Sequence, residues 1–322
     1  MDLSSKAISR RGVIGVTLAG ATAAVVSPAV AQSQPALKWR MVTSYPKSLD
    51  ALDGGCRMLA KIVSDLTDGK FDIQVFAAGE VVPALQVLDA VQSGTVEMGH
   101  SASYYYIGKN PALAFDTCLP FGLNARQHNA WMTHGGGAAL MQEVFAPYGI
   151  RVFPAGNTSA QMAGWFRKEI KTVEDFQGLK FRTGGLAGQV LAKLGVVPQQ
   201  LGAADVYPAL ERGTIDAAEW VGPYDDERLG LQKVAKYYYA PGWAEGSAQV
   251  SLYVGQKHWD ELPANYKAAV EAACATVNGW MLARYDNGNP AALKRLVAAG
   301  AQVRIYSREV LNALYDATEK LY

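Results

Sequence analysis

An alternation of strand patterns with helix patterns is the feature of this sequence that most restricts its fold. Polar and apolar residues alternate over residues 37–42 and strictly over residues 71–76, as in strands with one buried face. Apolar residues recur at helical spacing over residues 51–66 and 84–93, and a short strand is predicted at residues 96–99. Strands that alternate with helices pair in parallel and are covered by the helices, which predicts an α/β fold.

The same order starts again in the second half of the chain. Short strands are predicted at residues 151–154, 179–182 and 215–219, and helices at residues 188–193 and 203–212. A chain of 322 residues is too long for one ordinary core and suits about two domains. We therefore expect two α/β units.

A helix over residues 263–284 is the longest that the periodicity predicts. It begins at a proline, which is favourable at the start of a helix, and it carries an apolar stripe. Its length would let it span both units. A similar five-residue piece occurs at residues 94–98 and 213–217, where it closes a helix and opens a strand. This repeat indicates related local units and no duplication of the whole chain.

Residues 1–31 have the features of an export signal. Two adjacent arginines, Arg10 and Arg11, precede an apolar stretch over residues 13–26, and small residues end the segment at Ala31. This order predicts a twin-arginine signal peptide that is cleaved after Ala31. A membrane anchor is the alternative, but polar residues and glycines interrupt the stretch, which is shorter than the ~20 residues that a span needs.

The charge and the cysteines of the chain exclude two classes of site. The formal net charge is +1, and it becomes −1 without residues 1–31, which carry three basic residues and one acidic residue. Such a chain has no positive field to hold a nucleic acid. Cys56, Cys118 and Cys274 form neither a C-x-x-C pair nor a cluster with histidine, so we expect no zinc site and no disulfide framework.

Other patterns in the chain match no enzyme motif. Residues 135–137 lack the glycine spacing of a dinucleotide site, and the sequence around His100 lacks the second glycine of a nucleophile elbow. Three consecutive tyrosines at residues 104–106 could stack on a ligand, although such clusters belong to a core more often. The acidic run at residues 225–227 is interpreted as a solvated face rather than a cation site.

Two charged residues at the ends of predicted strands form the strongest candidate site. Arg182 ends the strand over residues 179–182, and ligands bind at the carboxyl ends of parallel strands. Its planar guanidinium can hold a carboxylate through two parallel hydrogen bonds. Glu219 ends another strand, where it either pairs with Arg182 or helps to hold a hard cation through oxygen ligands. The amide oxygen of Gln161 and the carbonyl oxygen of Trp220 could complete that second arrangement.

At these residues the chain resembles the solute-binding subunits of tripartite ATP-independent periplasmic (TRAP) transporters, over nearly all of the chain after residue 31. The segments that carry the resemblance are residues 78–80, 85–98, 173–182 (VEDFQGLKFR) and 207–217 (YPALERGTIDA). Together they are specific, and the third is the most characteristic of the family. The resemblance implies that Arg182 clamps the carboxylate of the substrate.

Within this family, the chain resembles the subgroup that binds 2-oxo or 2-hydroxy monocarboxylates through a metal ion. The resemblance implies that Gln161, Glu219 and the carbonyl of Trp220 hold a sodium or calcium ion that bridges to the substrate. The implied substrate-binding residues are Arg182, Gln161, Asn157, Tyr104, Glu245 and Trp220. Glu245 would act beside the substrate or behind the ion, and Asn157 and Tyr104 would be polar contacts from the other lobe.

The resemblance implies an α/β fold of the two-lobed periplasmic binding protein type, with a hinge and a long helix that crosses both lobes. The implied boundaries are residues 37–159 plus 248–287 for the first lobe and residues 160–247 plus 288–322 for the second. The hinge would lie near residues 157–161 and 245–250. A ligand held by both lobes favours the closed state.

The resemblance also implies a location and partners. The chain would work in the periplasm, and its closed form would be recognised by a membrane permease. Dimeric members use a long terminal helix, so the shorter C-terminal end of this chain puts a homodimer in doubt.

Two alternatives remain open. One is an exported enzyme that acts on a small organic acid, with Glu219 and Glu245 as an acid/base pair. The other is a subunit that presents its ligand to a sensor. The sequence does not rank pyruvate, a branched 2-oxo acid and lactate as ligands.

Overall fold

One sheet has five strands in the order β2-β1-β3-β10-β4, of which four come from residues 37–157 and the fifth, β10, from residues 249–255. The computed structural model describes residues 35–322, and the predicted signal peptide over residues 1–31 lies outside the described residues. The strands are β1 (Leu37–Thr43), β2 (Phe71–Phe76), β3 (Met98–Ser101), β4 (Ile150–Asn157) and β10 (Gln249–Gly255). β1 pairs in parallel with β2 and β3, as the strand–helix order predicts, whereas β10 inserts antiparallel between β3 and β4.

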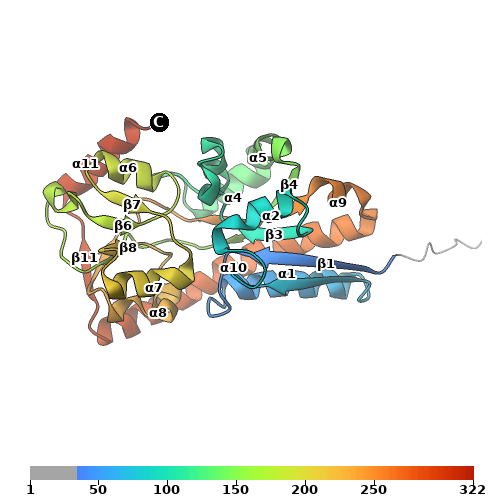
Figure 1. The fold of residues 1–322 in the computed structure, drawn as a ribbon, viewed down its shortest axis with the longest axis horizontal. Helices are drawn as coiled ribbons and strands as arrows, with labels where there is room; N and C mark the ends of the chain where they lie inside the picture. Colours follow the sequence, from blue (N-terminus) through green and yellow to red (C-terminus); the bar gives the residue numbers. More distant parts are fainter. Residues whose placement is uncertain (1–34) are drawn as a thin grey trace, which may run out of the picture. The chain divides into compact units, whose positions relative to one another are not determined.

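Helices cover both faces of this sheet (Figure 1). They are α1 (Leu52–Leu66) and α10 (Ala264–Ala298) on one face, and α2 (Val87–Gln92) and α5 (Gly137–Phe145) on the other. Shorter helices also lie around this sheet, namely α3 (Ala114–Thr117), α4 (Ala125–His134) and α9 (Gln256–Glu261). The apolar face of α1 is buried, which explains its helical periodicity in the sequence.

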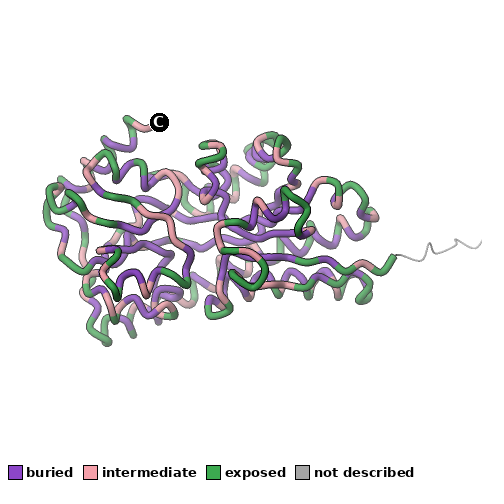
Figure 2. Tube along the Cα trace, in the orientation of Figure 1, coloured by how far each residue is buried: buried purple, intermediate pink, exposed green. Residues whose placement is uncertain are grey.

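The second sheet has six strands in the order β11-β9-β5-β8-β6-β7. They are β5 (Gly164–Phe166), β6 (Lys180–Arg182), β7 (Val197–Gln199), β8 (Ala217–Ala218), β9 (Tyr237–Ala240) and β11 (Gln302–Ile305). The helices around it are α6 (Ala187–Lys193), α7 (Ala203–Arg212), α8 (Pro223–Leu229) and α11 (Arg308–Glu319). β6 runs parallel to β7 and β8, so the carboxyl ends of β6 and β8 lie at the same edge of the sheet. Buried positions are frequent in the strands of both sheets apart from the edge strands β7 and β11, which have none (Figure 2).

The helix α10 has 35 residues and packs against β4 and α1 and then against α8. Gly156 in β4 allows the close approach, because a Cβ atom there would lie 2.6 Å from Met281 of α10. The helix continues beyond the predicted end at residue 284 and passes through Pro290, since Ala292 and Leu296 are buried in the core that α10 shares with both sheets. In the part of the chain that the structure describes, no helix is long and apolar enough to span a membrane.

The chain passes between the two sheets at residues 158–163, at residues 241–248 and along α10. The first two passages are joined by hydrogen bonds from the Thr158 amide to the Ala248 carbonyl (2.9 Å) and from the Ala248 amide to Thr158 Oγ1 (3.0 Å). Ser159 has a left-handed backbone (φ 61°), and its hydroxyl donates to Asp286 of α10. The exact lobe boundaries stay a prediction.

Candidate functional site

A small cavity of about 20 Å³ lies where elements of the two sheets meet. Its walls come from the segments that follow β1, β3 and β8 and from both passages between the sheets. Three of the residues predicted for the site line it directly, namely Tyr104, Gln161 and Trp220. This volume has room for about one water molecule.

Arg182, at the end of β6, is fully buried beside this cavity. Its Nε donates to the carbonyl of Leu201 (3.1 Å), and its Nη1 donates to the carbonyl of Glu219 and lies 3.5 Å from Glu219 Oε2. The guanidinium carbon lies 4.5 Å from the centre of the Trp220 ring. These contacts hold the guanidinium in one orientation, and its Nη2 has no hydrogen-bond partner. The group therefore keeps a donor for a ligand.

Two acidic side chains are buried together near Arg182. Burial, followed by the charge of Glu245, raises the pKa of Glu219 well above its ordinary value, and the Arg182 charge opposes this shift. Burial raises the pKa of Glu245 from 4.5 to about 7, although Arg182, Tyr104 and Gln161 lower it. Two ionised carboxyls beside one guanidinium are an unfavourable arrangement unless one of them takes up a proton or a further cation lies between them.

The remaining predicted residues lie around these charges. Gln161, in the first passage, donates from Nε2 to Thr158 Oγ1 (2.7 Å), which leaves its carbonyl oxygen without a partner. The Tyr104 ring follows β3 and lies against Gly184, where an added Cβ would be 1.9 Å from the ring. Asn157 is buried and accepts a hydrogen bond from the Ser159 amide (2.9 Å). Among the residues described, no hydrogen bond joins Asn157 to the other predicted site residues.

The structure corrects the interpretation of residues 225–227 as a solvated acidic face. Asp225 and Asp226 are buried, and only Glu227 is partly exposed, where it pairs with Arg295. Asp226 accepts hydrogen bonds from Trp165 Nε1 (2.9 Å) and from the hydroxyl of Tyr238 (2.6 Å). The acidic run lies at the start of α8, whose first turn packs inward against α10, so sequence polarity alone was misleading here.

The unpaired polar atoms of the site fall into two groups. Buried oxygen atoms without a hydrogen-bond partner are Gln161 Oε1, Glu219 Oε1, Glu245 Oε1 and Glu245 Oε2. Buried N–H groups without one are Arg182 Nη2, Asn157 Nδ2 and Trp220 Nε1. Because unpaired buried polar groups are costly, the acceptors fit a cation and the donors fit an anion.

The acceptor group has the chemistry of a site for a hard cation. Carboxylate, amide and backbone carbonyl oxygens are the ligands that such an ion takes. Within residues 35–322, no group of three or more His, Cys, Asp or Glu side chains is arranged to hold a metal ion. A cation at this site would therefore need the amide oxygen of Gln161 and a backbone carbonyl besides the carboxylates.

Sequence reasoning missed two residues that shape the site. Thr158 orients Gln161 and joins the two passages between the sheets. Tyr45 lines the cavity from the segment that follows β1. Tyr45 could have been found by the rule that located Arg182, because it also follows the carboxyl end of a parallel strand.

Comparison with known proteins identifies the family of this chain. The model of the DctP family, described as bacterial extracellular solute-binding protein, family 7, matches residues 43–322. A monocarboxylate 2-oxoacid-binding periplasmic protein of Nostoc sp. is 51% identical over 313 residues, which cover 95% of this chain and 86% of the relative.

Solved structures are similar in fold and in sequence. A TRAP transporter solute-binding protein from Bordetella bronchiseptica, a dimer with calcium and picolinate in one active site, has a TM-score of 0.88 and 56% identity, covering 89% of this chain and 86% of that chain. A TRAP solute-binding protein from Pseudoalteromonas atlantica with sodium and pyruvate has a TM-score of 0.86 and 42% identity, covering 88% and 87%. The chain belongs to the DctP family of bacterial extracellular solute-binding proteins.

Proposed function

We propose that this chain is the periplasmic subunit of a TRAP transporter that captures a small 2-oxo monocarboxylate, such as pyruvate, together with a sodium or calcium ion. The observation that carries the proposal is the coexistence, in one buried site, of unpaired donors centred on Arg182 and unpaired acceptors centred on Glu219 and Glu245. The relatives that bind pyruvate with sodium and picolinate with calcium support it.

Each side chain has a role in this proposal. Arg182 donates from its free Nη2 to the substrate carboxylate, and the buried Asn157 and Trp220 offer further N–H donors. Glu219, Gln161 and the carbonyl of Trp220 hold the ion, which supplies positive charge to the oxygen atoms of the substrate. The low dielectric of the buried site strengthens each of these contacts and disfavours uncharged analogues.

Binding would be coupled to closure of the two lobes. The site draws on elements of both sheets, so a ligand gains all of its contacts only when the sheets are close together. A ligand that binds the closed state more tightly shifts the population toward it. The closed protein then delivers the substrate to the membrane permease of the transporter. The family consists of solute-binding receptors, which argues against the hypothesis of an exported enzyme. One relative forms a dimer, so a homodimer of this chain remains a possible assembly.

Titration calorimetry with pyruvate tests the proposal. Wild-type protein and Glu219→Gln are compared in buffers that contain sodium, calcium, or neither ion with choline as the cation. Glu169→Gln is the matched control, because Glu169 pairs with Arg304 on the surface. We expect wild-type binding to require one of the two ions and Glu219→Gln to weaken ion and pyruvate binding together. Pyruvate affinity that is independent of both the ions and Glu219 would contradict the ion-bridged arrangement.

A further inference from the structure

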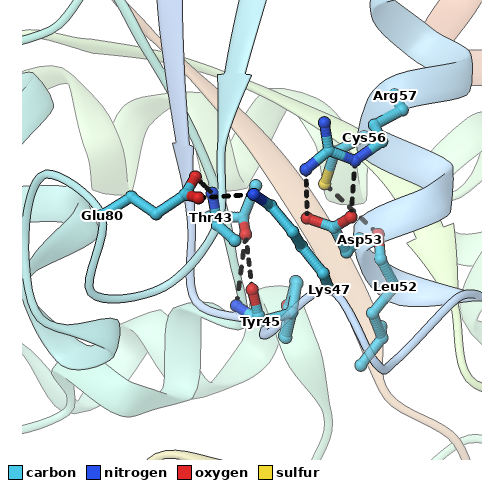
Figure 3. Close-up of polar contacts among 9 residues, drawn as sticks. Thr43, Tyr45, Lys47, Leu52, Asp53, Cys56, Arg57 and Glu80 are labelled. Atoms are coloured by element: carbon cyan, nitrogen blue, oxygen red, sulfur yellow. Dashed lines mark hydrogen bonds and ion pairs between the residues drawn. The ribbon is translucent and has the colours of Figure 1, made fainter.

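The Tyr45 side chain is a polar feature of the cavity that the proposed roles do not use. It is 1% exposed, it lines the cavity, and its hydroxyl has no hydrogen-bond partner. Its backbone is held by Thr43, whose Oγ1 accepts from the Tyr45 amide (3.2 Å) and donates to the Tyr45 carbonyl (3.1 Å) (Figure 3). The Tyr45 carbonyl also accepts from the amide of Ala78 (3.0 Å). The ring is therefore anchored next to the cavity with a free hydroxyl.

The cavity that Tyr45 lines has both polar and aliphatic walls. Part of the remaining wall is formed by Tyr104, Tyr105, Thr158, Gln161 and Trp220, and the rest by the aliphatic side chains of Leu52, Ala102, Val221, Ala248 and Val250. Leu52, which begins α1, lines the same cavity as Tyr45. Such a lining suits the carbon chain of a ligand, and a buried hydroxyl without a partner is unfavourable there. An oxygen atom on the ligand would satisfy it.

We propose that Tyr45 is a specificity-determining residue that hydrogen-bonds an oxygen atom at the end of the substrate remote from its carboxylate. The preferred substrates are then short 2-oxo monocarboxylates with a terminal hydroxyl group, rather than those of the same size with a terminal methyl group. This inference rests on the proposed function, in which Arg182 and the ion hold the other end of the molecule. A site that hydrogen-bonds a substrate hydroxyl discriminates against the analogue that lacks it, because a buried group is then left unpaired.

Two pairs of acids of matched size test the inference. Hydroxypyruvate and 2-oxobutyrate differ only by a hydroxyl in place of a methyl group, and 4-hydroxy-2-oxobutyrate and 2-oxovalerate form the same pair with one more carbon. The affinities of all four are measured by calorimetry, with sodium and calcium present, for wild-type protein, Tyr45→Phe and Tyr306→Phe. Tyr306 is the matched control, because its hydroxyl is also buried and unpaired but it does not line this cavity.

We expect wild-type protein to prefer the hydroxylated acid of at least one pair by about tenfold, the usual effect of one buried hydrogen bond. Tyr45→Phe should abolish this preference, and Tyr306→Phe should keep it. Tyr45→Phe should fold normally, because it removes only an unpaired hydroxyl, and its melting temperature checks this.

The possible failures are distinguishable. Equal affinities within both pairs for wild-type protein, or a preference that survives in Tyr45→Phe, would overturn the role of Tyr45 and leave the proposed function intact. Absence of binding for all four acids and for pyruvate would overturn the proposed function and this inference with it.

Discussion

Replacement of Glu245 by glutamine should stabilise the ligand-free protein at alkaline pH while weakening ion-dependent binding. Glu245 is 2% exposed, neither of its carboxyl oxygens has a hydrogen-bond partner, and Glu219 lies near enough to interact with it electrostatically. Burial raises its pKa from 4.5 to about 7. The ionised side chain is thus unfavourable in the folded protein until a cation binds, and the neutral amide of glutamine lacks this penalty.

The magnitude follows from the pKa. A group whose pKa is higher in the folded than in the unfolded state binds more protons when folded, so its contribution to stability is full below the unfolded pKa and is lost as the pH rises through the folded value. For Glu245 that window runs from 4.5 to about 7, and the loss across it is about 3 kcal/mol. The gain in unfolding free energy for Glu245→Gln should therefore be about 2 kcal/mol larger at pH 8 than at pH 5.

Urea unfolding of both proteins at pH 5 and pH 8, with choline in place of sodium and with calcium chelated, measures this difference. Glu169→Gln serves as the control, because Arg304 lowers the pKa of Glu169 instead of raising it. We therefore expect no stabilisation of the Glu169→Gln protein at pH 8. Calorimetry with pyruvate and sodium measures the loss of binding. An equal change in stability at both pH values, or a destabilised Glu245→Gln protein at pH 8, would refute the reasoning.

Two further substitutions test the geometry of the site. Arg182→Lys keeps the charge but loses the hydrogen bonds to Leu201 and Glu219. We expect pyruvate affinity to fall about 100-fold by calorimetry and the unfolding free energy to fall by about 2 kcal/mol in urea. Unchanged pyruvate affinity would show that the positive charge alone is sufficient for binding. Gly184→Ala places a Cβ atom 1.9 Å from the Tyr104 ring, across the contact between the two sheets. The affinity of the Gly184→Ala protein for pyruvate should fall more than tenfold with little change in melting temperature. A protein that fails to fold would instead show that the added methyl group disrupts the second sheet itself.

Periodicity predicted the elements that have one buried face. The strands at residues 37–42 and 71–76 and the helix at residues 51–66 agree with β1, β2 and α1 to within a residue. Buried residues lie on one side of α1 and at alternate positions at the start of β1 and β2, so the pattern survives in the sequence. β10 was not predicted, because all seven of its residues are buried and a central strand has no alternation. The helix α10 ran past its predicted end, because tertiary packing outweighed the local effect of Pro290.

The proximity of candidate site residues was predicted where the residue type was distinctive, and their roles in binding stay predictions. Arg182 and Glu219 lie at the ends of β6 and β8, and the parallel register brings them together, so the sheet-edge rule was sufficient for both. Glu245 lies in a passage between the sheets with no regular pattern, and only the family resemblance pointed to it. The burial of Asp225 and Asp226 could not be predicted, because it depends on the packing of α8 against α10.

The proline inside α10 gives the long helix an uneven bending stiffness. Pro290 has no amide hydrogen, so the carbonyl of Asp286 one turn earlier receives no helical hydrogen bond from it. The side chain of that same Asp286 holds Ser159, in the first passage between the sheets. The turn of α10 that lacks this hydrogen bond is thus joined, through Asp286 and Ser159, to the first passage between the sheets. We therefore expect any bending of α10 to be concentrated at this turn.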